Sequence, residues 1–436
     1  MIKNSGSNIL SIKQLHRTGQ LEAAKKGYIA ILRKQPHHIE ALHGLGILYT
    51  QQENFLKATY YLQQVMTYEP HDPILPLHLA NVFKAQGLFS QAVQLLQNLL
   101  ITHPGYTPAL NNLGTAYYAQ GNTHQAILAY REAIEKQPDY RDAYYNLGLA
   151  LAKENKLEEA IFIYKKLLDD APDYQAARFQ LACLYMQQEQ LQAAIDEFLQ
   201  IEIDQPYHFE TQTNLGTCYI KARAFQEAHR HYLKALALNS QDIQVLFNLG
   251  VINLHLGQVD PGIQYYQKAI AINPDFFAAH HNLAAAFLIK HHAHFALRHF
   301  KEALRLQPEN ATIAYHVQAL EQNQHLLAAP NDYIKSLFDA YADHYEPHLL
   351  AALDYQIPGL FYQTLFPHLN LKSNWQILDI GCGTGLCGIP FKPFARHLSG
   401  IDLSDNMLAI AAEKQIYNEL FTGDFIAVLA DKKAKI

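Results

Sequence analysis

The chain has 436 residues, of which 49% are hydrophobic and 17% are charged, and these proportions exclude a disordered polypeptide and predict two or three folded domains. The 34 basic and 40 acidic side chains give a formal net charge of −6 without a basic run, so nucleic acid is not expected as a ligand, because binding it requires cations that neutralise phosphates. The four cysteines form no CxxC pair, and the sequence has neither a signal-peptide core nor an apolar stretch of roughly 18 residues, so we expect a cytoplasmic protein without a membrane span.

A period of 34 residues runs through the first three hundred positions. Twelve residues after each repeated position there is a second small residue, and twelve residues further there is a proline in every unit except the one that has Ser240. We expect two helices per unit that cross at the small residues, with the proline ending the second helix. The repeated positions are Ile12, Gly46, Ala80, Gly114, Gly148, Ala182, Gly216, Gly250 and Ala284.

Bulky residues fill the predicted seam between the two helices, as Leu113, Tyr117, Ile127 and Tyr130 do in one unit. This pattern of a leucine-glycine pair, an aromatic residue, alanine, a second aromatic residue and proline resembles the tetratricopeptide repeat. The resemblance implies a mainly α fold, with nine repeats over residues 5–310 stacked as a right-handed superhelical solenoid whose first helices line the concave side. Residues 311–329 would form a capping helix and a linker.

An amide side chain recurs two residues before the repeated small position. The set comprises Asn112, Asn146, Gln180, Asn214, Asn248 and Asn282. An amide can bond both the N–H and the C=O groups of an extended peptide, so this ladder predicts an extended polypeptide segment as the partner. Similar asparagine ladders occur in the repeats of the O-linked N-acetylglucosamine transferase family. The alternative is that the amides only bond the backbone of the neighbouring helix.

The other inner positions of the repeats separate two kinds of peptide ligand. Repeats that bind a terminal carboxylate place lysine and arginine on the inner helices, whereas this chain has Tyr145, Phe179 and Phe247 there. We therefore expect an internal peptide segment and not a carboxy-terminal tail. No metal site is predicted, because the histidines of HHAHFALRHF, residues 291–300, lack the spacing of two ligands on one helical face.

The 34-residue register ends before Pro330, and residues 330–365 read as two amphipathic helices that separate near Pro358. The run WQILDI, Trp375–Ile380, then predicts a strand, followed by a glycine turn, a helix through Leu386 and a second strand that ends at Asp402. This order is a βαβ unit, so we expect a partial Rossmann-like α/β domain over residues 330–436.

The glycine turn admits two cofactor classes. GTGLCG matches the GxGxxG pattern, and Asp402 follows at the distance typical of dinucleotide-binding folds. However, DIGCGTG together with IDLSDNMLAIAA resembles the first two motifs of class I S-adenosylmethionine-dependent methyltransferases, and the whole chain resembles a bacterial family of predicted methyltransferases with tetratricopeptide repeats.

The methyltransferase resemblance implies S-adenosyl-L-methionine as the cofactor and assigns a role to several residues. Gly381, Gly383 and Gly385 would line its methionine and ribose, Asp379 would orient its amino group, Asp402 would hold the ribose and Asp424 the adenine. Tyr341 or Tyr345 would contact it from the preceding helix. Cys382 and Leu403 complete the predicted cofactor-binding set, although a small and buried cysteine is expected to be inert.

The resemblance stops after Asp424, where only FIAVLADKKAKI remains. The family continues with four more strands and the motif that contacts the substrate, so we expect this chain to contain only the amino-terminal half of the domain. Three explanations are open: a truncated or frameshifted gene, a domain that another chain completes, and a vestigial module. Whether the chain is an enzyme therefore stays open, and no catalytic residue is predicted. The alternative is a non-enzymatic interaction scaffold, and neither the methyl acceptor nor the oligomeric state is indicated.

Overall fold

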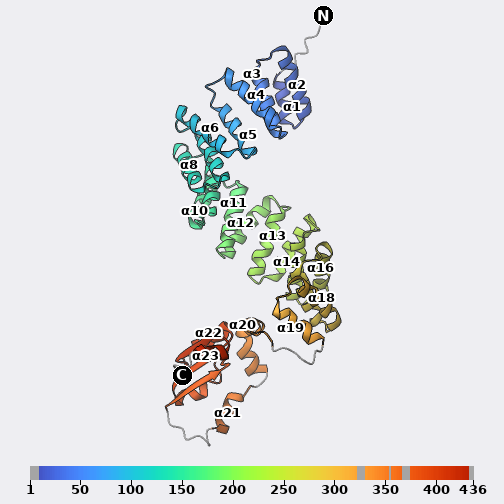
Figure 1. Cartoon of the computed structure of the whole chain (residues 1–436), viewed down its shortest axis with the longest axis vertical. Helices are drawn as coiled ribbons and strands as arrows, with labels where there is room; N and C mark the ends of the chain where they lie inside the picture. The colour runs from blue at the N-terminus through green and yellow to red at the C-terminus, as the bar shows by residue number, and fades with distance from the viewer. Residues whose placement is uncertain (1–8, 322–328, 353–354, 366–373, 432–436) are drawn as a thin grey trace. The chain divides into compact units, whose positions relative to one another are not determined.

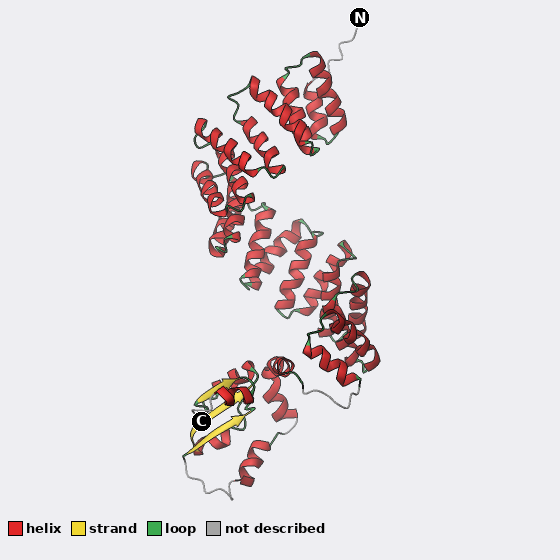
Figure 2. Cartoon of the chain, viewed as in Figure 1, coloured by secondary structure: helices red, strands yellow, loops and turns green. Residues whose placement is uncertain are grey.

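The computed structural model describes residues 9–321, 329–352, 355–365 and 374–431. The chain divides into two compact units, Met1–Ser240 and Gln241–Ile436. The division falls inside the repeats, at the unit that has Ser240 in place of the periodic proline. Figure 1 traces the elements in chain order, and Figure 2 shows that strands occur only near the carboxyl terminus of the described chain. Among the described helices, none has the length and apolar content needed to cross a bilayer.

The first unit consists of paired antiparallel helices. They are α1 (Ile9–Arg17), α2 (Leu21–Lys34), α3 (Ile39–Gln51), α4 (Phe55–Tyr68), α5 (Ile74–Ala85), α6 (Phe89–Thr102), α7 (Thr107–Ala119), α8 (Thr123–Lys136), α9 (Arg141–Lys153), α10 (Leu157–Asp170), α11 (Gln175–Gln187), α12 (Leu191–Asp204), α13 (Phe209–Lys221) and α14 (Phe225–Leu238). The second unit continues with α15 (Ile243–His255), α16 (Val259–Ile272), α17 (Phe277–Ile289), α18 (Ala293–Leu306) and the single helix α19 (Ala311–Leu320).

Close approach at the small positions holds each pair together. A Cβ atom added to Gly148 of α9 would lie 2.4 Å from the Tyr164 ring of α10, and Tyr164 is fully buried. The predicted seam of α7 and α8 is buried at Leu113, Ile127 and Tyr130, while Tyr117 stays half-exposed. The small residues therefore let the axes approach, as the sequence predicted.

The carboxy-terminal part begins with α20 (Asn331–Pro347), a π-helical turn η1 (His348–Ala352) and α21 (Ile357–Leu365). Its sheet has the parallel order β1-β2-β3, formed by β1 (Trp375–Ile380), β2 (Ala395–Asp402) and β3 (Glu419–Thr422), with α22 (Asp405–Glu413) between β2 and β3 and α23 (Phe425–Asp431) after β3. In register, Asp379 lies beside Gly400 and Asp402 lies beside Thr422. The carboxyl ends of β1 and β2 thus meet at one edge, which positions the site.

The predicted α-helix after the glycine turn is wrong. Residues 383–388 form turns, followed by a short 3-10 helix η3 (Ile389–Phe394) that leads into β2. Pro393 lies inside this short helix and opposes a longer α-helix, because a proline inside a helix removes a backbone donor and clashes with the preceding turn.

Candidate functional site

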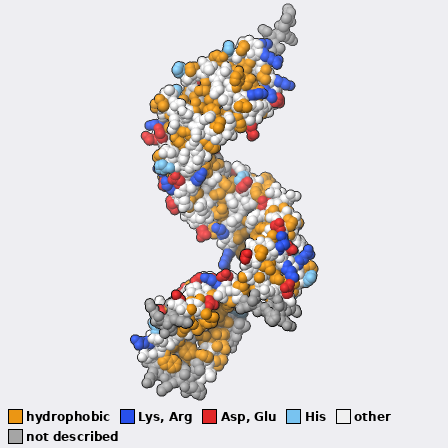
Figure 3. Space-filling view, viewed as in Figure 1, with side chains coloured by type: hydrophobic (Ala, Val, Ile, Leu, Met, Phe, Trp, Pro, Cys, Tyr) orange, Lys and Arg blue, Asp and Glu red, His pale blue; other side chains and the backbone are white. Residues whose placement is uncertain are grey.

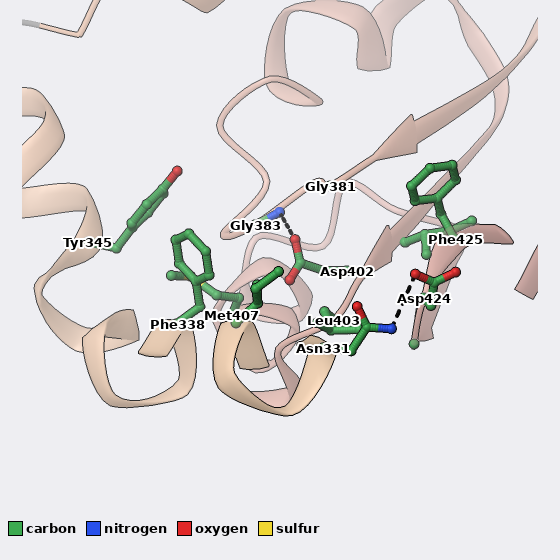
Figure 4. A pocket seen from close by; sticks show the side chains of 13 residues that line it. Asn331, Phe338, Tyr345, Gly381, Gly383, Asp402, Leu403, Met407, Asp424 and Phe425 are labelled. Carbon is green, nitrogen blue, oxygen red and sulfur yellow. Dashed lines mark hydrogen bonds between the residues drawn. The ribbon is translucent and has the colours of Figure 1, made fainter. Parts of the chain in front are cut away.

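A cavity of about 370 Å³ opens where α20 faces the glycine turn and the ends of β2 and β3 (Figure 4). This volume lies within the range of small-molecule pockets. Its wall combines backbone from the glycine turns, two carboxylates and apolar side chains. The lining residues are Asn331, Ile334, Phe338, Tyr345, Gly381, Gly383, Ile401, Asp402, Leu403, Met407, Gly423, Asp424 and Phe425.

The carboxylate of Asp402 is held by two backbone N–H groups, one from the glycine turn after β1 and one from the residues after β2. The N–H of Gly383 donates to its Oδ2 at 2.8 Å, and the N–H of Ser404 donates to its Oδ1 at 2.9 Å. Gly383 has φ +52° and Gly381 has φ +71°, the left-handed conformation that glycine adopts without strain. Because an ionised carboxylate has roughly four acceptor positions, Asp402 can still accept from two hydroxyl groups of a ligand.

Asp424 follows the end of β3 and lines the cavity beside Asn331 and Phe425 (Figure 4). Its Oδ1 accepts from the N–H groups of Ile426 and Ala427 at 2.9 and 3.2 Å. Its Oδ2 is 3.4 Å from the amide nitrogen of Asn331 on α20, a long contact drawn in Figure 4. A ligand amine that reached this oxygen would form a shorter bond than the one Asn331 makes.

Polar contacts hold α20 over the cavity. The hydroxyl of the buried Ser404 donates to Asp339 Oδ1 at 2.5 Å, and the backbone N–H of Asn406 donates to the same oxygen at 3.2 Å. Lys335 forms an ion pair with Asp405 at 2.5 Å, and Lys414 pairs with Glu346. These contacts join α20 to the first turn and the end of α22, so the helix is a fixed wall of the cavity in this structure.

Five of the predicted cofactor-binding residues line the cavity: Gly381, Gly383, Asp402, Leu403 and Asp424. The other four lie outside its lining, although they are close in sequence. They are Asp379, Cys382, Gly385 and Tyr341.

The surroundings of these four residues account for their position outside the cavity lining. The Tyr417 hydroxyl donates to Asp379 Oδ2 at 2.6 Å, and burial raises the pKa of Asp379. A Cβ atom on Gly385 would lie 2.9 Å from the Tyr417 ring. Burial raises the pKa of the Cys382 thiol to about 12, which keeps it protonated near neutral pH. The Tyr341 hydroxyl bonds His348, whereas Tyr345, the second tyrosine candidate of the same helix, lines the cavity.

Sequence reasoning expected a tyrosine of α20 at the cofactor but missed the other residues of this helix that line the cavity, Asn331, Ile334 and Phe338. Asn331, Ile334, Phe338 and Tyr345 are spaced by three, four and seven residues, so they lie on one face of the helix and all reach the cavity. This spacing is visible in the sequence and was the available signal. Met407 of α22 completes the wall in Figure 4, and no local pattern distinguishes it from a core methionine.

A second, more apolar hollow of about 490 Å³ lies between α21 and the segment that follows the glycine turn. Leu350, Leu360 and Ile389 in its wall are about half exposed. On the face that Figure 3 shows, hydrophobic side chains gather over the carboxy-terminal part, while acidic and basic side chains are interspersed over the repeats.

The predicted amide ladder lies half-exposed on the first helices of the repeats. In the first unit, Asn146 donates to Asn111 Oδ1 at 2.9 Å, Asn112 accepts from Lys84 at 3.3 Å and Asn214 lies 3.8 Å from the Cys183 sulfur. Gln180 occupies the same repeat position on α11. These partners are side chains, unlike the backbone contacts of the alternative interpretation.

In the second unit, Asn248 accepts from Gln244 at 3.1 Å, and Asn282 lies 3.5 Å from the Tyr266 hydroxyl. The histidines of residues 291–300 are spread over a turn and α18, where His299 lies 3.1 Å from the ring nitrogen of His280 on α17. Over the described ranges, no group of three or more metal-ligating side chains is gathered.

Comparison with known families supports the repeats. Models of the tetratricopeptide repeat match residues 77–139, 111–174, 151–210 and 243–276. The chain therefore contains tetratricopeptide repeats arranged as helix pairs. Over 48 residues, 11% of this chain, it is 42% identical to the 18S rRNA (guanine-N(7))-methyltransferase RID2 of Arabidopsis thaliana, and it spans 17% of that relative's length.

Several solved structures are similar to part of the chain. The carboxy-terminal part of a repeat protein from Cytophaga hutchinsonii is 16% identical, with a TM-score of 0.49 over 55% of this chain and 99% of that one. YrrB, described as a TPR protein with an unusual peptide-binding site, is 23% identical, with a TM-score of 0.40 over 44% and 98% of the two chains. MamA is 25% identical, with a TM-score of 0.37 over 38% and 96%.

Proposed function

We propose that this protein is a tetratricopeptide-repeat scaffold that binds an extended polypeptide segment and carries a domain that binds S-adenosyl-L-methionine. The observation that carries the cofactor proposal is that Asp402 and Asp424 line the same cavity as the backbone of Gly381 and Gly383. Two separated carboxylates suit a nucleoside, whose ribose hydroxyls and adenine amine are hydrogen-bond donors. The match to a methyltransferase over 48 residues supports the same choice.

The residues present fit this cofactor. Asp402 would accept from the ribose hydroxyls with the acceptor positions that the backbone leaves open, and Asp424 would accept from the adenine amine. Phe338 and Tyr345 of α20 and Met407 of α22 would cover the ligand and limit its contact with water. When bound, the cofactor supplies an electrophilic methyl group.

Calorimetry on the full chain tests the cofactor proposal. We expect S-adenosyl-L-methionine and S-adenosyl-L-homocysteine to bind, and Asp402→Asn and Asp424→Ala to weaken binding about tenfold or more, because each removes a charge-assisted hydrogen bond. Asp343→Asn, an exposed acid of α20 outside the cavity, is the matched control. Circular dichroism checks that each variant is folded.

Three results of this experiment have different meanings. Absence of binding at millimolar cofactor would reject the cofactor proposal, and tighter binding of a nicotinamide dinucleotide would favour the alternative cofactor class. Binding without methyl transfer to any tested acceptor would leave a cofactor-binding scaffold. Only transfer of a labelled methyl group would make the protein an enzyme.

The peptide-binding proposal rests on the half-exposed amides that recur on consecutive first helices. We expect the triple change of Asn112, Asn146 and Asn214 to Ala to weaken peptide binding strongly, because each amide supplies both a donor and an acceptor to an extended backbone. A variant with exposed glutamines of the second helices changed to Ala, such as Gln91 and Gln192, is the control. Retained affinity in the triple variant would refute the role of the amides.

A further inference from the structure

Several polar contacts join successive first helices in the first unit. His43 of α3 and His78 of α5 lie 2.7 Å apart through ring nitrogens, Lys84 of α5 donates to α7, and Asn146 of α9 donates to Asn111 of α7. All of these contacts run between first helices. Lys84 contributes a cation to them.

The surroundings of Lys84 are unusual for a lysine. The ammonium group donates to Thr115 Oγ1 at 2.8 Å and to Asn112 Oδ1 at 3.3 Å, both neutral oxygens, and the side chain is half-buried. Within the described residues, Lys84 makes no ion pair, while lysines such as Lys234 and Lys290 pair with acids. The positive charge is thus withdrawn from water without an opposite charge to compensate it.

The equivalent positions in the next three repeats have no charged residue. One, two and three repeats further on, the chain has Tyr118, Ala152 and Met186, so an uncharged side chain suits this place in the helix. Burial lowers the pKa of Lys84 to about 8, because the partly buried site destabilises the charged form of the ammonium group. An anion that docked here would relieve this cost and use the third donor of the ammonium group.

We propose that Lys84, Asn112 and Thr115 form a subsite for the side-chain carboxylate of an aspartate or glutamate in the bound polypeptide. The proposal rests on the peptide-binding function proposed above and narrows its ligand to segments that contain an acid at a fixed place. Lys84 supplies the charge-assisted bond, while Asn112, one of the ladder amides, can donate with the amide nitrogen that Lys84 does not use.

A display selection tests this inference. A library of random internal peptides is selected on the full-length protein and on Lys84→Met, which keeps an unbranched side chain of similar length without the charge. We expect peptides selected on the wild type to carry Asp or Glu at one position. Changing that residue to its amide should weaken binding about tenfold on the wild type and less than twofold on Lys84→Met. Lys26→Met, an exposed lysine of α2, is the control and should behave as the wild type does.

A further peptide distinguishes a side-chain carboxylate from the carboxylate of a chain terminus. An otherwise identical peptide with the amide in place of the acid and a free carboxyl terminus should bind as weakly as its blocked form, and equal binding to the acidic peptide would show capture of a chain terminus instead. Selected peptides without a fixed acid, or an equal loss on the wild type and Lys84→Met, would overturn the subsite while leaving peptide binding intact. Recovery of no peptide by either protein would refute the peptide-binding function itself.

Discussion

At the crossings within the helix pairs, glycine stands opposite tyrosine in Gly114–Tyr130, Gly148–Tyr164, Gly216–Tyr232 and Gly250–Tyr266. The same two repeat positions hold alanine with phenylalanine or leucine in Ala80–Leu96, Ala182–Phe198 and Ala284–Phe300. Two pairs depart from the rule: Gly46 with Leu62, and Ile12 with Tyr28, whose ring instead lies over Gly44. A tyrosine ring that lies over the crossing leaves no room for a Cβ atom, so the residue type at one position constrains the other.

Gly148→Ala tests this constraint. The new Cβ would lie 2.4 Å from the Tyr164 ring, and overpacking of this kind costs about 1–3 kcal/mol. That cost exceeds the gain of about 1 kcal/mol from replacing a helical glycine, so the free energy of unfolding should fall. Chemical denaturation measures it, and Gly148→Ala with Tyr164→Phe, which copies the Ala182–Phe198 pair, should recover part of the loss. A single variant as stable as the wild type would contradict the argument.

At the scale of the element, α20 connects the cavity to α22 through Asp339. The carboxylate accepts from the hydroxyl of Ser404, whose side chain is fully buried, and from the N–H of Asn406. The same helix presents Ile334, Phe338 and Tyr345 to the cavity. The contacts of Asp339 therefore set the position of the apolar wall that the proposed cofactor would meet.

Asp339→Ala should loosen this wall. The change leaves the buried Ser404 hydroxyl without its acceptor, which costs about 1–3 kcal/mol. We expect faster hydrogen exchange in α20 and weaker binding of S-adenosyl-L-methionine, because the ligand must then also order the helix. Asp343→Ala, an exposed acid of the same helix, should leave both measurements unchanged. Unaltered exchange in α20 after Asp339→Ala would show that other contacts hold the helix.

At the scale of the whole molecule, both units contain histidines that the fold keeps uncharged. His231 in the first unit is fully buried, and its ring lies 2.8 Å from the Gln212 amide oxygen; burial lowers its pKa below the ordinary value. In the second unit, burial is the main cause that lowers the pKa of His299 to about 4, and the neighbouring His280 lowers it further in the same direction. Each group therefore links the stability of its unit to pH.

The sign of this linkage follows from proton uptake. Between about pH 6.5 and pH 4 the unfolded chain binds protons at these histidines and the folded chain does not, so the free energy of unfolding should fall as the pH falls through this range. Each group contributes up to about 1.4 kcal/mol per pH unit. Urea unfolding at several pH values measures this slope, which His299→Phe should reduce and the exposed His291→Asn should not. Equal slopes in these two variants would contradict the assignment.

The sequence by itself determined the helix pairs and the bounds of the first strands. The 34-residue period fixes where small residues, bulky residues and prolines recur, and the structure places helices accordingly, with α19 after the ninth pair. The run Trp375–Ile380 is β1, and β2 ends at Asp402, both as predicted. These features are readable because helix and strand periodicity, glycine turns and proline stops are encoded by residues close together in the chain.

Only the tertiary structure decided which of the predicted residues face the cavity. Asp379 lies among the predicted motif residues, yet its carboxylate bonds Tyr417, while Tyr345 rather than Tyr341 reaches the lining. Turns followed by the short 3-10 helix η3 take the place of the predicted helix, and Asp339 meets Ser404 across 65 positions of sequence. Such contacts depend on how α20 packs against the sheet edge, and a local pattern of residues carries no information about that packing.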